Sequence, residues 1–363
     1  MAASTRLDPA IDGRAPPTMH TGGDLDPAEV DCGFLNPSAT LPLTITPRDP
    51  ALRVEPDRVM DWFGRHTAEL DSLFTHHGAV LLRGFAIAHT ATFRRLIDHF
   101  PPHAMGYIAG AAPRRSIGEG VYESTRMPPA ARIGLHQEMA YMPGAPRLLA
   151  FYCHRPPDRG GETPLADMRS VTRRLTGASL HLFERRGVMY RRNFAADRTS
   201  ADPVDTGPGL YHRSVRDAFL TDSRDRVESL CAERGLDWEW LQDGSLTVTH
   251  IGPATVRHPR TGERLWFNQA STQHVNARSV GSATLKTLRR EYGQRPAWPY
   301  DIRFGDGQPM TESDLIPVYD ALAAEEVRFE WRRGDVLWID NLRVAHGRNP
   351  YRGPRDIQVA LLD

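Results

Sequence analysis

The strongest constraint on the fold is a series of short strand-like runs that do not alternate regularly with helices. These runs are rich in aliphatic and aromatic residues and cover residues 79–82, 148–153, 188–194, 246–251, 254–258, 265–268, 327–331, 336–339 and 357–362. Helical periodicity occurs at residues 56–77, 92–99, 168–175, 222–234, 283–292 and 312–325. A doubly wound parallel sheet needs alternating strands and helices. The pattern therefore predicts a mainly β fold, a sandwich or barrel core surrounded by helices.

The first 40 residues differ in composition from the rest of the chain. They are rich in Pro, Gly, Asp, Ala and Thr and show no apolar periodicity, so we expect residues 1–40 to be disordered or draped over the surface. Residues 41–363 are expected to form a single domain with insertions. The two longest stretches without a clear core pattern are 101–132 and 195–244, and we expect both to cover the mouth of a functional site.

Charge and cysteine content restrict the partners and the cellular compartment. The 363 residues include 45 Lys and Arg against 45 Asp and Glu, a balance that argues against binding to nucleic acid or to an anionic membrane. Three scattered cysteines make neither a disulfide framework nor a CxxC pair. No run reaches the roughly 18 apolar residues of a membrane span, and no signal pattern opens the chain. We therefore expect a cytoplasmic protein that acts on a small molecule or on one defined protein partner.

Common catalytic motifs are missing from the sequence. It contains no GxGxxG that opens a helix after a strand, and no GxxxxGKS/T, GxSxG or HExxH. Nucleotide-binding, α/β-hydrolase and zincin functions therefore lack their usual anchors. Histidine and carboxylate clusters remain as the candidates for chemistry.

A pair of candidate metal ligands lies just after the first long stretch. In an extended segment, side chains i and i+2 point to one face, so His136 and Glu138 can converge on one ion. His346, which follows the predicted strand 336–339, is the candidate third ligand. Two histidines and one carboxylate hold one face of Fe(II) and leave three positions open for a bidentate oxoacid and O₂. Taken alone, the pair is weak support for a metal site, since the chain has 15 histidines.

An arginine near the C-terminus makes this pattern more specific. Arg355 precedes the last predicted strand, and its planar guanidinium suits the far carboxylate of a dicarboxylate such as 2-oxoglutarate. An inward-facing arginine on a strand can instead pair with an internal Asp or Glu.

At this point the sequence resembles the taurine dioxygenase-like (TauD/TfdA) family of Fe(II)/2-oxoglutarate oxygenases. The resemblance is greater to its clavaminate synthase-like branch, in which Glu replaces Asp among the ligands. It rests on blocks that occur in the family's order: YEST at 122–125, LHQEMAY at 135–141, GGETPLAD at 160–167, RHP at 257–259, WFNQ at 266–269, GDVL at 334–337 and AHGRNPYRGPR at 345–355. This order is more specific than any single block.

The resemblance implies a double-stranded β-helix fold of the jelly-roll or cupin type. It also implies that His136, Glu138 and His346 bind Fe(II), that Arg355 and Thr163 hold the distal carboxylate of 2-oxoglutarate, and that O₂ is the oxidant. It implies no catalytic side chain beyond the metal ligands.

The same resemblance narrows the substrate. Related halogenases have a small residue where this chain has Glu138, and sulfonate-oxidising members have a second arginine where it has Val359, so halogenation and sulfonate substrates are disfavoured. By analogy with the branch, we expect hydroxylation of an unactivated C–H of an amino acid or amino-acid derivative, free or tethered to a carrier protein, in specialised-metabolite or antibiotic biosynthesis. The candidate substrate-binding residues are Gln137, Met139, Arg132, Asn268 and His274.

Several alternatives remain open at this stage. Asn268 could cap a turn, His274 could be a core hydrogen bonder and Arg132 could be solvated. The same cofactors could support desaturation or cyclisation. A zinc-dependent hydrolase could use the same two histidines and glutamate, although it would leave Arg355 and Thr163 without a role. A catalytically inactive β-barrel is disfavoured because the set of metal ligands is intact.

Overall fold

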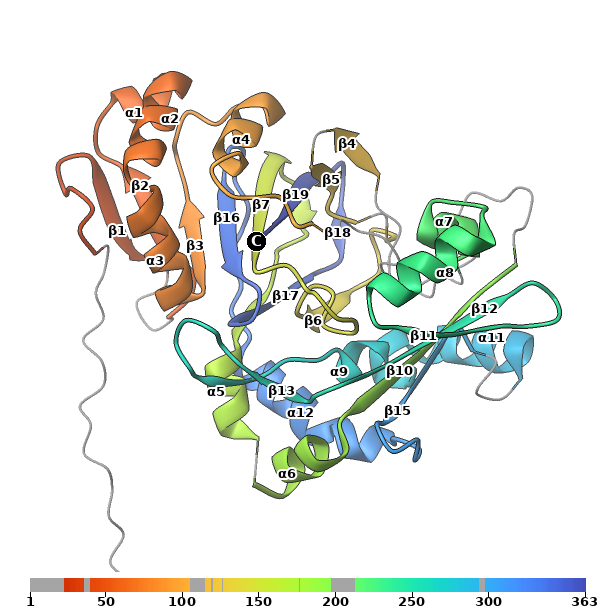
Figure 1. Ribbon diagram of the computed structural model, residues 1–363. Coiled ribbons are helices and arrows are strands. Elements are labelled where there is room, and N and C mark those ends of the chain that lie inside the picture. The colour runs from red at the N-terminus through yellow and green to blue at the C-terminus, as the bar shows by residue number, and fades with distance from the viewer. Residues whose placement is uncertain are drawn as a thin grey trace, which may run out of the picture.

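An eight-stranded sheet forms the larger wall of the core in the computed structural model, which describes residues 23–35, 40–104, 115–118, 120–125, 127–175, 177–196, 213–293 and 298–363 (Figure 1). In spatial order its strands are β1 (Val30–Phe34), β2 (Leu43–Pro47), β3 (Ala79–Leu82), β16 (Val336–Asp340), β7 (Leu148–Arg155), β19 (Asp356–Leu362), β5 (Val121–Glu123) and β4 (Ser116–Gly118). Only β2 and β3 pair in parallel. Strands from both ends of the sequence thus lie side by side in one sheet.

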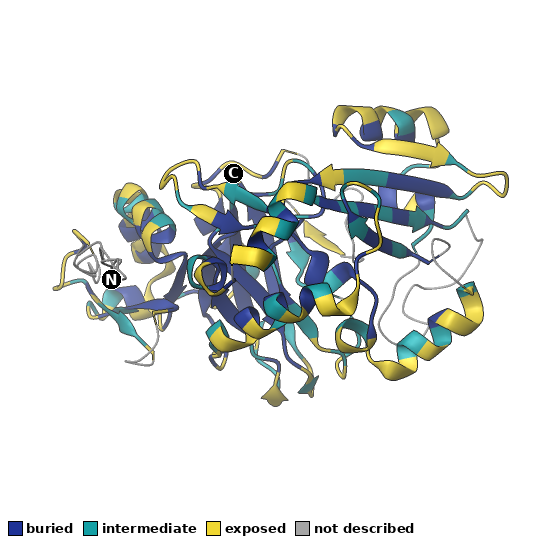
Figure 2. Cartoon of the chain, turned by 90° about the horizontal axis from the view of Figure 1, so that it is seen from below, coloured by how far each residue is buried: buried dark blue, intermediate teal, exposed yellow. Residues whose placement is uncertain are grey.

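The two faces of this sheet contribute side chains to two different apolar clusters. Along β7, Leu148, Ala150 and Tyr152 pack against the cluster that includes helices α2 (Pro56–Arg65), α3 (Thr67–His77) and α4 (Thr90–Ile97). Leu149 and Phe151 point to the opposite face and join the interior cluster. The central strands are therefore mostly dark in the burial view (Figure 2). Burial on both faces explains why these strands read as continuous apolar runs.

A three-stranded sheet forms the opposite wall of the interior. It consists of β6 (Ile133–His136), β17 (Val344–Arg348) and β9 (Leu165–Asp167), with β17 in the centre. The ring of Phe151, on β7, lies 5.1 Å from the ring of His346, on β17, so the two walls touch at this point. The two sheets make the double-stranded β-helix core, and the predicted fold class is confirmed.

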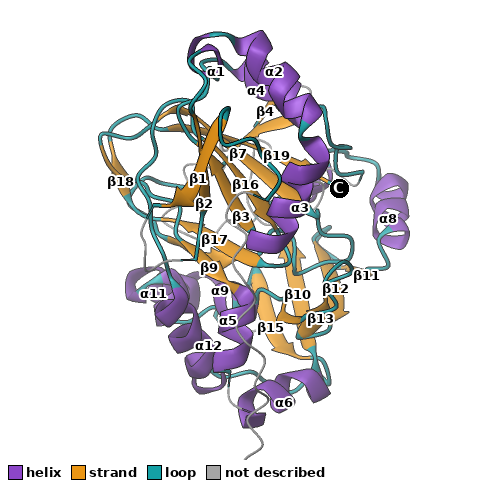
Figure 3. Ribbon diagram, turned by 90° about the vertical axis from the view of Figure 1, so that its left-hand side faces the viewer, coloured by secondary structure: helices purple, strands orange, loops and turns teal. Residues whose placement is uncertain are grey.

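The remaining elements surround this core (Figure 3). A four-stranded sheet contains β11 (Asp237–Trp240), β12 (Leu246–Gly252), β10 (Val188–Phe194) and β15 (Tyr300–Phe304). Two small pairs are β13 (Thr255–Arg257) with β14 (Arg264–Trp266), and β18 (Tyr351–Arg352) with β8 (Arg159–Gly160). The other helices are α1 (Ala51–Val54), α5 (Met168–Arg174), α6 (Gly177–Arg186), α7 (Val215–Phe219), α8 (Arg224–Glu233), α9 (Ala270–Gln273), α10 (Ala277–Val280), α11 (Ser282–Tyr292) and α12 (Glu312–Glu325). Within the described ranges, none of the helices has the length and apolar character to cross a membrane.

Two predicted elements differ from the structure. The helix expected over 56–77 is broken at His66, whose φ of −107° and ψ of 17° are not helical. Next to it, the hydroxyl of Thr67 donates to the carbonyl of Phe63, a side-chain bond that competes with a regular helix. The strand expected over 327–331 is also wrong, because only Val327 forms a bridge, with Leu165. Three residues later, the carbonyl of Glu330 accepts from the Arg83 side chain instead of from a neighbouring strand.

Part of the segment 1–40 forms a strand of the large sheet. Strand β1 pairs with β2 along its whole length, from Val30 opposite Pro47 to Phe34 opposite Leu43. The side chain of Val30 is buried, and this burial ties the strand to the edge of the large sheet. Residues 1–22 and 36–39 of the predicted N-terminal segment lie outside the described residues.

Replacement of Trp338 by Ala should strongly destabilise the protein. Its indole is fully buried on β16 and stacks on Phe74, with ring centroids 4.9 Å apart. Loss of such a side chain costs about 3–5 kcal/mol, measurable by urea unfolding. Trp238 is the matched control because it is 38% exposed, and Trp238→Ala should change the free energy of unfolding by about 0.5 kcal/mol. Equal losses in the two variants would contradict this account of the core.

Candidate metal centre and active site

Pairing of β6 with β17 brings the two predicted histidine ligands together. His136 and His346 stand opposite each other in this antiparallel pair, and their ring centroids are 4.4 Å apart. Glu138 lies two residues beyond His136, the last residue of β6, and its Oε2 is 3.8 Å from Nε2 of His346. One potential ligand atom from each of the three residues lies within 4.8 Å of the others. This two-histidine, one-carboxylate set suits a divalent metal such as Fe(II), which it would hold on one face.

Contacts with the backbone orient two of these ligands. Nδ1 of His136 donates to the carbonyl of Gly134 at 2.9 Å, so Nε2 carries the lone pair that a metal would use. The side chain of Asn341 accepts from the backbone N–H of Glu138 at 2.7 Å and donates to its carbonyl at 2.9 Å. Asn341 also donates to the carbonyl of Pro146 at 2.9 Å. It therefore fixes the segment that carries the carboxylate.

A cavity of about 530 Å³ opens beside the three ligands. His136, Glu138 and His346 all line it, together with the other two predicted cofactor residues, Thr163 and Arg355. Several described residues of the first long insertion, between positions 124 and 132, are part of the cavity wall. None of the described residues of the second insertion, 195–196 and 213–244, is part of the lining.

Arg355 is a cation in this wall whose hydrogen bonds among the described residues go to neutral groups. Its Nε donates to the carbonyl of Gly161 and its Nη1 to the hydroxyl of Ser124, both at 3.3 Å. Among the described residues, no carboxylate lies within ion-pair distance of its guanidinium. Burial, with a smaller repulsion from Arg348, lowers the pKa of Arg355 to about 10, so the side chain is still charged at neutral pH. A ligand carboxylate would supply the missing partner.

The hydroxyl of Thr163 is oriented by an indole. Nε1 of Trp331 donates to Oγ1 of Thr163 at 3.0 Å, and both side chains are buried. Because an indole N–H can only donate, the threonine oxygen is the acceptor and its own proton can be given to a ligand oxygen. Thr163 is therefore suited to bind a carboxylate.

Two glycines before Thr163 allow the chain to pass close to this site. Gly160 and Gly161 have φ of +69° and +72°, a region that favours glycine. A Cβ on Gly161 would lie 2.7 Å from Cγ of Pro157 and 3.3 Å from Nε of Arg355. A side chain at this position would therefore disturb the guanidinium.

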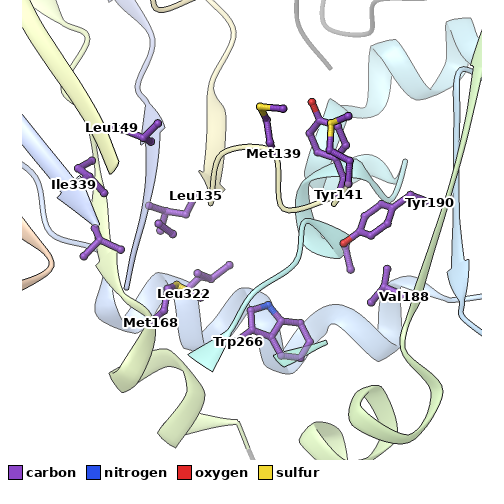
Figure 4. Close-up of a cluster of buried hydrophobic side chains, with 14 of the residues drawn as sticks. Leu135, Met139, Tyr141, Leu149, Met168, Val188, Tyr190, Trp266, Leu322 and Ile339 are labelled. Atoms are coloured by element: carbon purple, nitrogen blue, oxygen red, sulfur yellow. The ribbon is translucent and has the colours of Figure 1, made fainter. Parts of the chain in front are cut away.

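Two of the predicted substrate residues adjoin the metal ligands but point away from the cavity. Nε2 of Gln137 donates to the carbonyl of Leu342 at 2.8 Å. Met139 is fully buried in the interior apolar cluster with Leu135 and Tyr141 (Figure 4). Neither side chain is part of the cavity lining.

Of the other three predicted substrate residues, two make hydrogen bonds to the backbone outside the cavity and one lines the cavity. Asn268 donates to the carbonyl of Ala254 at 2.9 Å, and His274 contacts the carbonyl of Met310 through Nε2 at 2.9 Å. Both lie outside the lining. Arg132 does line the cavity, where it also pairs with Glu326 at 2.6 Å.

Other wall residues were not predicted from the sequence. They are Tyr141, Phe151, Gln269, Gln273, Arg278 and Arg348 among others. Gln269 is the last residue of the WFNQ block and directly follows Asn268, the residue predicted to bind substrate. The same block could therefore have pointed to Gln269. Gln273 and Arg278 follow on α9 and α10, where no motif marked them.

Among the described residues that line the cavity, Glu138 is the only carboxylate, so none of them supplies a second carboxylate as general base. A zinc hydrolase of the kind considered above needs a further base to activate water. The arrangement favours an oxygenase instead, because it gives both Arg355 and Thr163 a role.

Comparison with protein families and relatives agrees with this geometry. The model of the family described as "Taurine catabolism dioxygenase TauD, TfdA family" matches residues 40–361. The dapdiamide synthesis protein DdaC of Enterobacter agglomerans is 32% identical over 307 residues, which cover 82% of this chain and 88% of that protein. A clavaminate synthase-like protein of Arabidopsis thaliana is 30% identical over 296 residues, which cover 80% of this chain and 83% of that protein.

Solved structures show the same fold. PvcB, described as an Fe, alpha-ketoglutarate dependent oxygenase from an isonitrile synthetic pathway, matches with a TM-score of 0.51 and 18% identity over 94% of this chain and 95% of that one. A second structure, of PvcB from Pseudomonas aeruginosa, matches with a TM-score of 0.50 and 15% identity over the same shares of the two chains. Together with the two-histidine, one-glutamate cluster, these matches confirm the resemblance seen in the sequence. The chain therefore belongs to the TauD/TfdA family of Fe(II)- and 2-oxoglutarate-dependent oxygenases.

Proposed function

We propose that the protein hydroxylates an unactivated C–H of an amino-acid derivative, free or bound to a carrier protein, in the biosynthesis of a specialised metabolite. The observation that carries the proposal is the joint presence, in one cavity wall, of the metal-ligand cluster and of the half-buried Arg355, which has no carboxylate partner among the described residues. A family relative named for dapdiamide synthesis, with 32% identity, supports the pathway class.

Different residues would bind the metal and the co-substrate. His136, Glu138 and His346 hold the metal, and Arg355 and Thr163 bind the distal carboxylate of 2-oxoglutarate. When bound, the iron and 2-oxoglutarate together supply the oxidising power that breaks the C–H bond. The chain itself orients the substrate against this centre. The position of the substrate decides between hydroxylation, desaturation and cyclisation.

Packing at position 359 argues against a sulfonate substrate of the taurine type. Val359 is fully buried in the interior apolar cluster on β19, so this position offers no cation. The arginines that do line the cavity are Arg132, Arg278, Arg348 and Arg355. Arg132 pairs with Glu326 and Arg278 with Asp320, whereas Arg355 has no carboxylate within ion-pair distance among the described residues.

The proposal is tested by the visible charge-transfer band that forms when Fe(II) and 2-oxoglutarate are added without O₂. We expect the band in the wild-type protein and its loss in Glu138→Ala, since one ligand and its charge are removed. Glu330→Ala is the control, because this glutamate is exposed and lies outside the cavity lining. A wild-type protein without the band, or a Glu138→Ala variant with an unchanged band, would disprove the proposed site.

Replacement of Arg355 by Gln should weaken binding of 2-oxoglutarate while the fold is kept. Loss of a charge-assisted hydrogen bond costs about 1.5–3 kcal/mol, so the apparent requirement for 2-oxoglutarate should rise by about 10- to 100-fold. Steady-state succinate formation at varied 2-oxoglutarate concentration measures this requirement. Arg352→Gln, three residues earlier and exposed, should behave as wild type. An equal increase in the requirement for substrate would count against the assigned role.

Replacement of Asn341 by Ala should weaken metal binding, although Asn341 is not a ligand. The variant loses both hydrogen bonds that hold the Glu138 backbone, and such supporting contacts are worth about 10- to 100-fold in metal affinity. Mn(II) titration followed by electron paramagnetic resonance gives the affinity. Gln308→Ala, an exposed amide, is the control. Unchanged affinity in Asn341→Ala would show that the segment from His136 to Glu138 keeps its conformation without this residue.

A further inference from the structure

One arginine fixes the segment that precedes β6 to β17. Arg348 is buried on β17, and its guanidinium donates to three backbone carbonyls. Nη1 donates to the carbonyl of Met127 at 2.8 Å, and Nη2 donates to those of Pro128 at 2.7 Å and Ala131 at 2.5 Å. Residues 127–131, here called the wall segment, form neither helix nor strand, so these bonds hold the backbone in place of a regular ladder.

A bulge in β6 turns the next lining residue toward the metal ligands. His346 stands opposite His136 in the pair of β6 with β17. Two residues further along β17, Arg348 stands opposite Ile133, so β6 has one residue more than β17 between the paired positions. Residues opposite each other share a face of a sheet, and so do residues i and i+2. Ile133 therefore lies on the face of His136 and lines the cavity, whereas regular alternation would point it away.

The bulge depends on a glycine between the two paired residues of β17. A Cβ on Gly347 would lie 2.6 Å from the carbonyl oxygen of Ile133, closer than a side-chain carbon can approach. Glycine lets the bulged backbone come this near. The sequence His-Gly-Arg at 346–348 therefore supplies a metal ligand, the space for the bulge and the arginine that holds the wall segment.

The wall segment and the bulge present mainly apolar side chains to the cavity. None of these side chains is buried, so a ligand can reach them. They are Met127, Pro128, Ala130, Ala131 and Ile133. Phe151 also lines the cavity and adds an apolar ring beside the metal ligands, 5.1 Å from the ring of His346. A ligand group that contacts these side chains is bound more tightly if it is itself apolar.

Several polar side chains of the cavity wall already have partners within the protein. Arg132 pairs with Glu326, and Arg278 pairs with Asp320. Hydrogen bonds within the protein also engage the side chains of Thr125, Gln269, Thr272 and Ser279. A polar ligand group would have to compete with these bonds, whereas an apolar group can contact the wall segment without displacing any of them.

We propose that the wall segment, Ile133 and Phe151 receive an apolar side chain of the substrate, so that the protein acts on an amino-acid derivative with an apolar rather than a polar side chain. Arg348 is a positioning residue, because it holds the wall segment without itself being apolar. This inference rests on the proposed function, since it assigns the substrate class of the same cavity.

The test compares ligands of equal size in the protein loaded with Fe(II) and 2-oxoglutarate without O₂. The probes are two pairs, leucine with asparagine and valine with threonine. Each is used as the free amino acid, the N-acetyl amino acid and the amino-acid methylamide, because the inference concerns only the side chain. The shift of the charge-transfer band during titration gives each dissociation constant. In at least one of these forms we expect the apolar member of a pair to bind about 10-fold more tightly or better.

Variants of the apolar wall show whether it makes the distinction. Ile133→Thr and Met127→Gln each introduce a polar group of similar size, so the preference for the apolar member should fall by about 3-fold or more. Ile251→Thr and Met189→Gln are the matched controls. Both positions lie outside the lining, and these variants should keep the wild-type preference.

Replacement of Arg348 by Met tests its positioning role. The variant loses the bonds to the wall segment, so backbone N–H groups at 130–133 should exchange faster with deuterium, and the preference should fall by about 3-fold or more. A merely structural role would lower the midpoint of urea unfolding without a change in preference. Arg352→Met, at an exposed position, should change neither the exchange nor the preference.

The outcomes separate this inference from the proposed function. The inference is wrong if no probe shifts the band, if the polar members bind the wild-type protein as tightly as the apolar ones, or if both Ile133→Thr and Met127→Gln keep the preference. An unchanged preference in Arg348→Met would overturn the role given to Arg348. In each of these cases the band without probe is still present, and the assignment of metal and co-substrate stands. Absence of that band in the wild-type protein would instead disprove the proposed function itself.

Discussion

The antiparallel pairing of β6 with β17 is the interaction on which the site depends. These short strands come from parts of the sequence about 200 residues apart, and their register places His136 directly opposite His346. A shift of one residue would turn one histidine to the other face of the small sheet. The large sheet and its helices therefore support function by holding this register, since β7 packs Phe151 against His346 from the other wall.

Next to the metal ligands, the cavity wall contains a cation that is incompletely paired. The half-buried guanidinium of Arg355 has two hydrogen bonds at 3.3 Å and no carboxylate within ion-pair distance among the described residues. Such a cation is stabilised when a ligand carboxylate binds to it. The structure thus leaves a charge available at the point where the co-substrate would bind.

The parts of the site that were predictable from the sequence depend on local geometry. His136 and Glu138 were identified because i and i+2 side chains share a face in an extended segment. The same rule places Gln137 on the opposite face, which explains why it is bonded to Leu342 instead of lining the cavity. At Met139 the backbone adopts a φ of 57°, rare for a residue other than glycine, and no sequence pattern indicated this turn.

Long-range contacts account for what could not be predicted. The strands β4, β6 and β9 are too short to show a period of two, and they exist because neighbouring strands complete their hydrogen bonds. Gln273 lies on a four-residue helix, and its position in the cavity wall depends on a bond to Gln269, which in turn donates to the backbone carbonyl of Gln137. By contrast β3, β10 and α12 have the predicted bounds, because strong apolar patterning and clear end signals are local properties.

The central claim is that one cavity wall holds both the metal and the distal carboxylate of 2-oxoglutarate. A crystal structure of the protein with Mn(II) and 2-oxoglutarate tests it most directly. The account predicts a single ion bound by His136, Glu138 and His346, with the far carboxylate of 2-oxoglutarate on Arg355 and Thr163. An ion bound by other residues, or a carboxylate held by another arginine of the cavity such as Arg278, would contradict it.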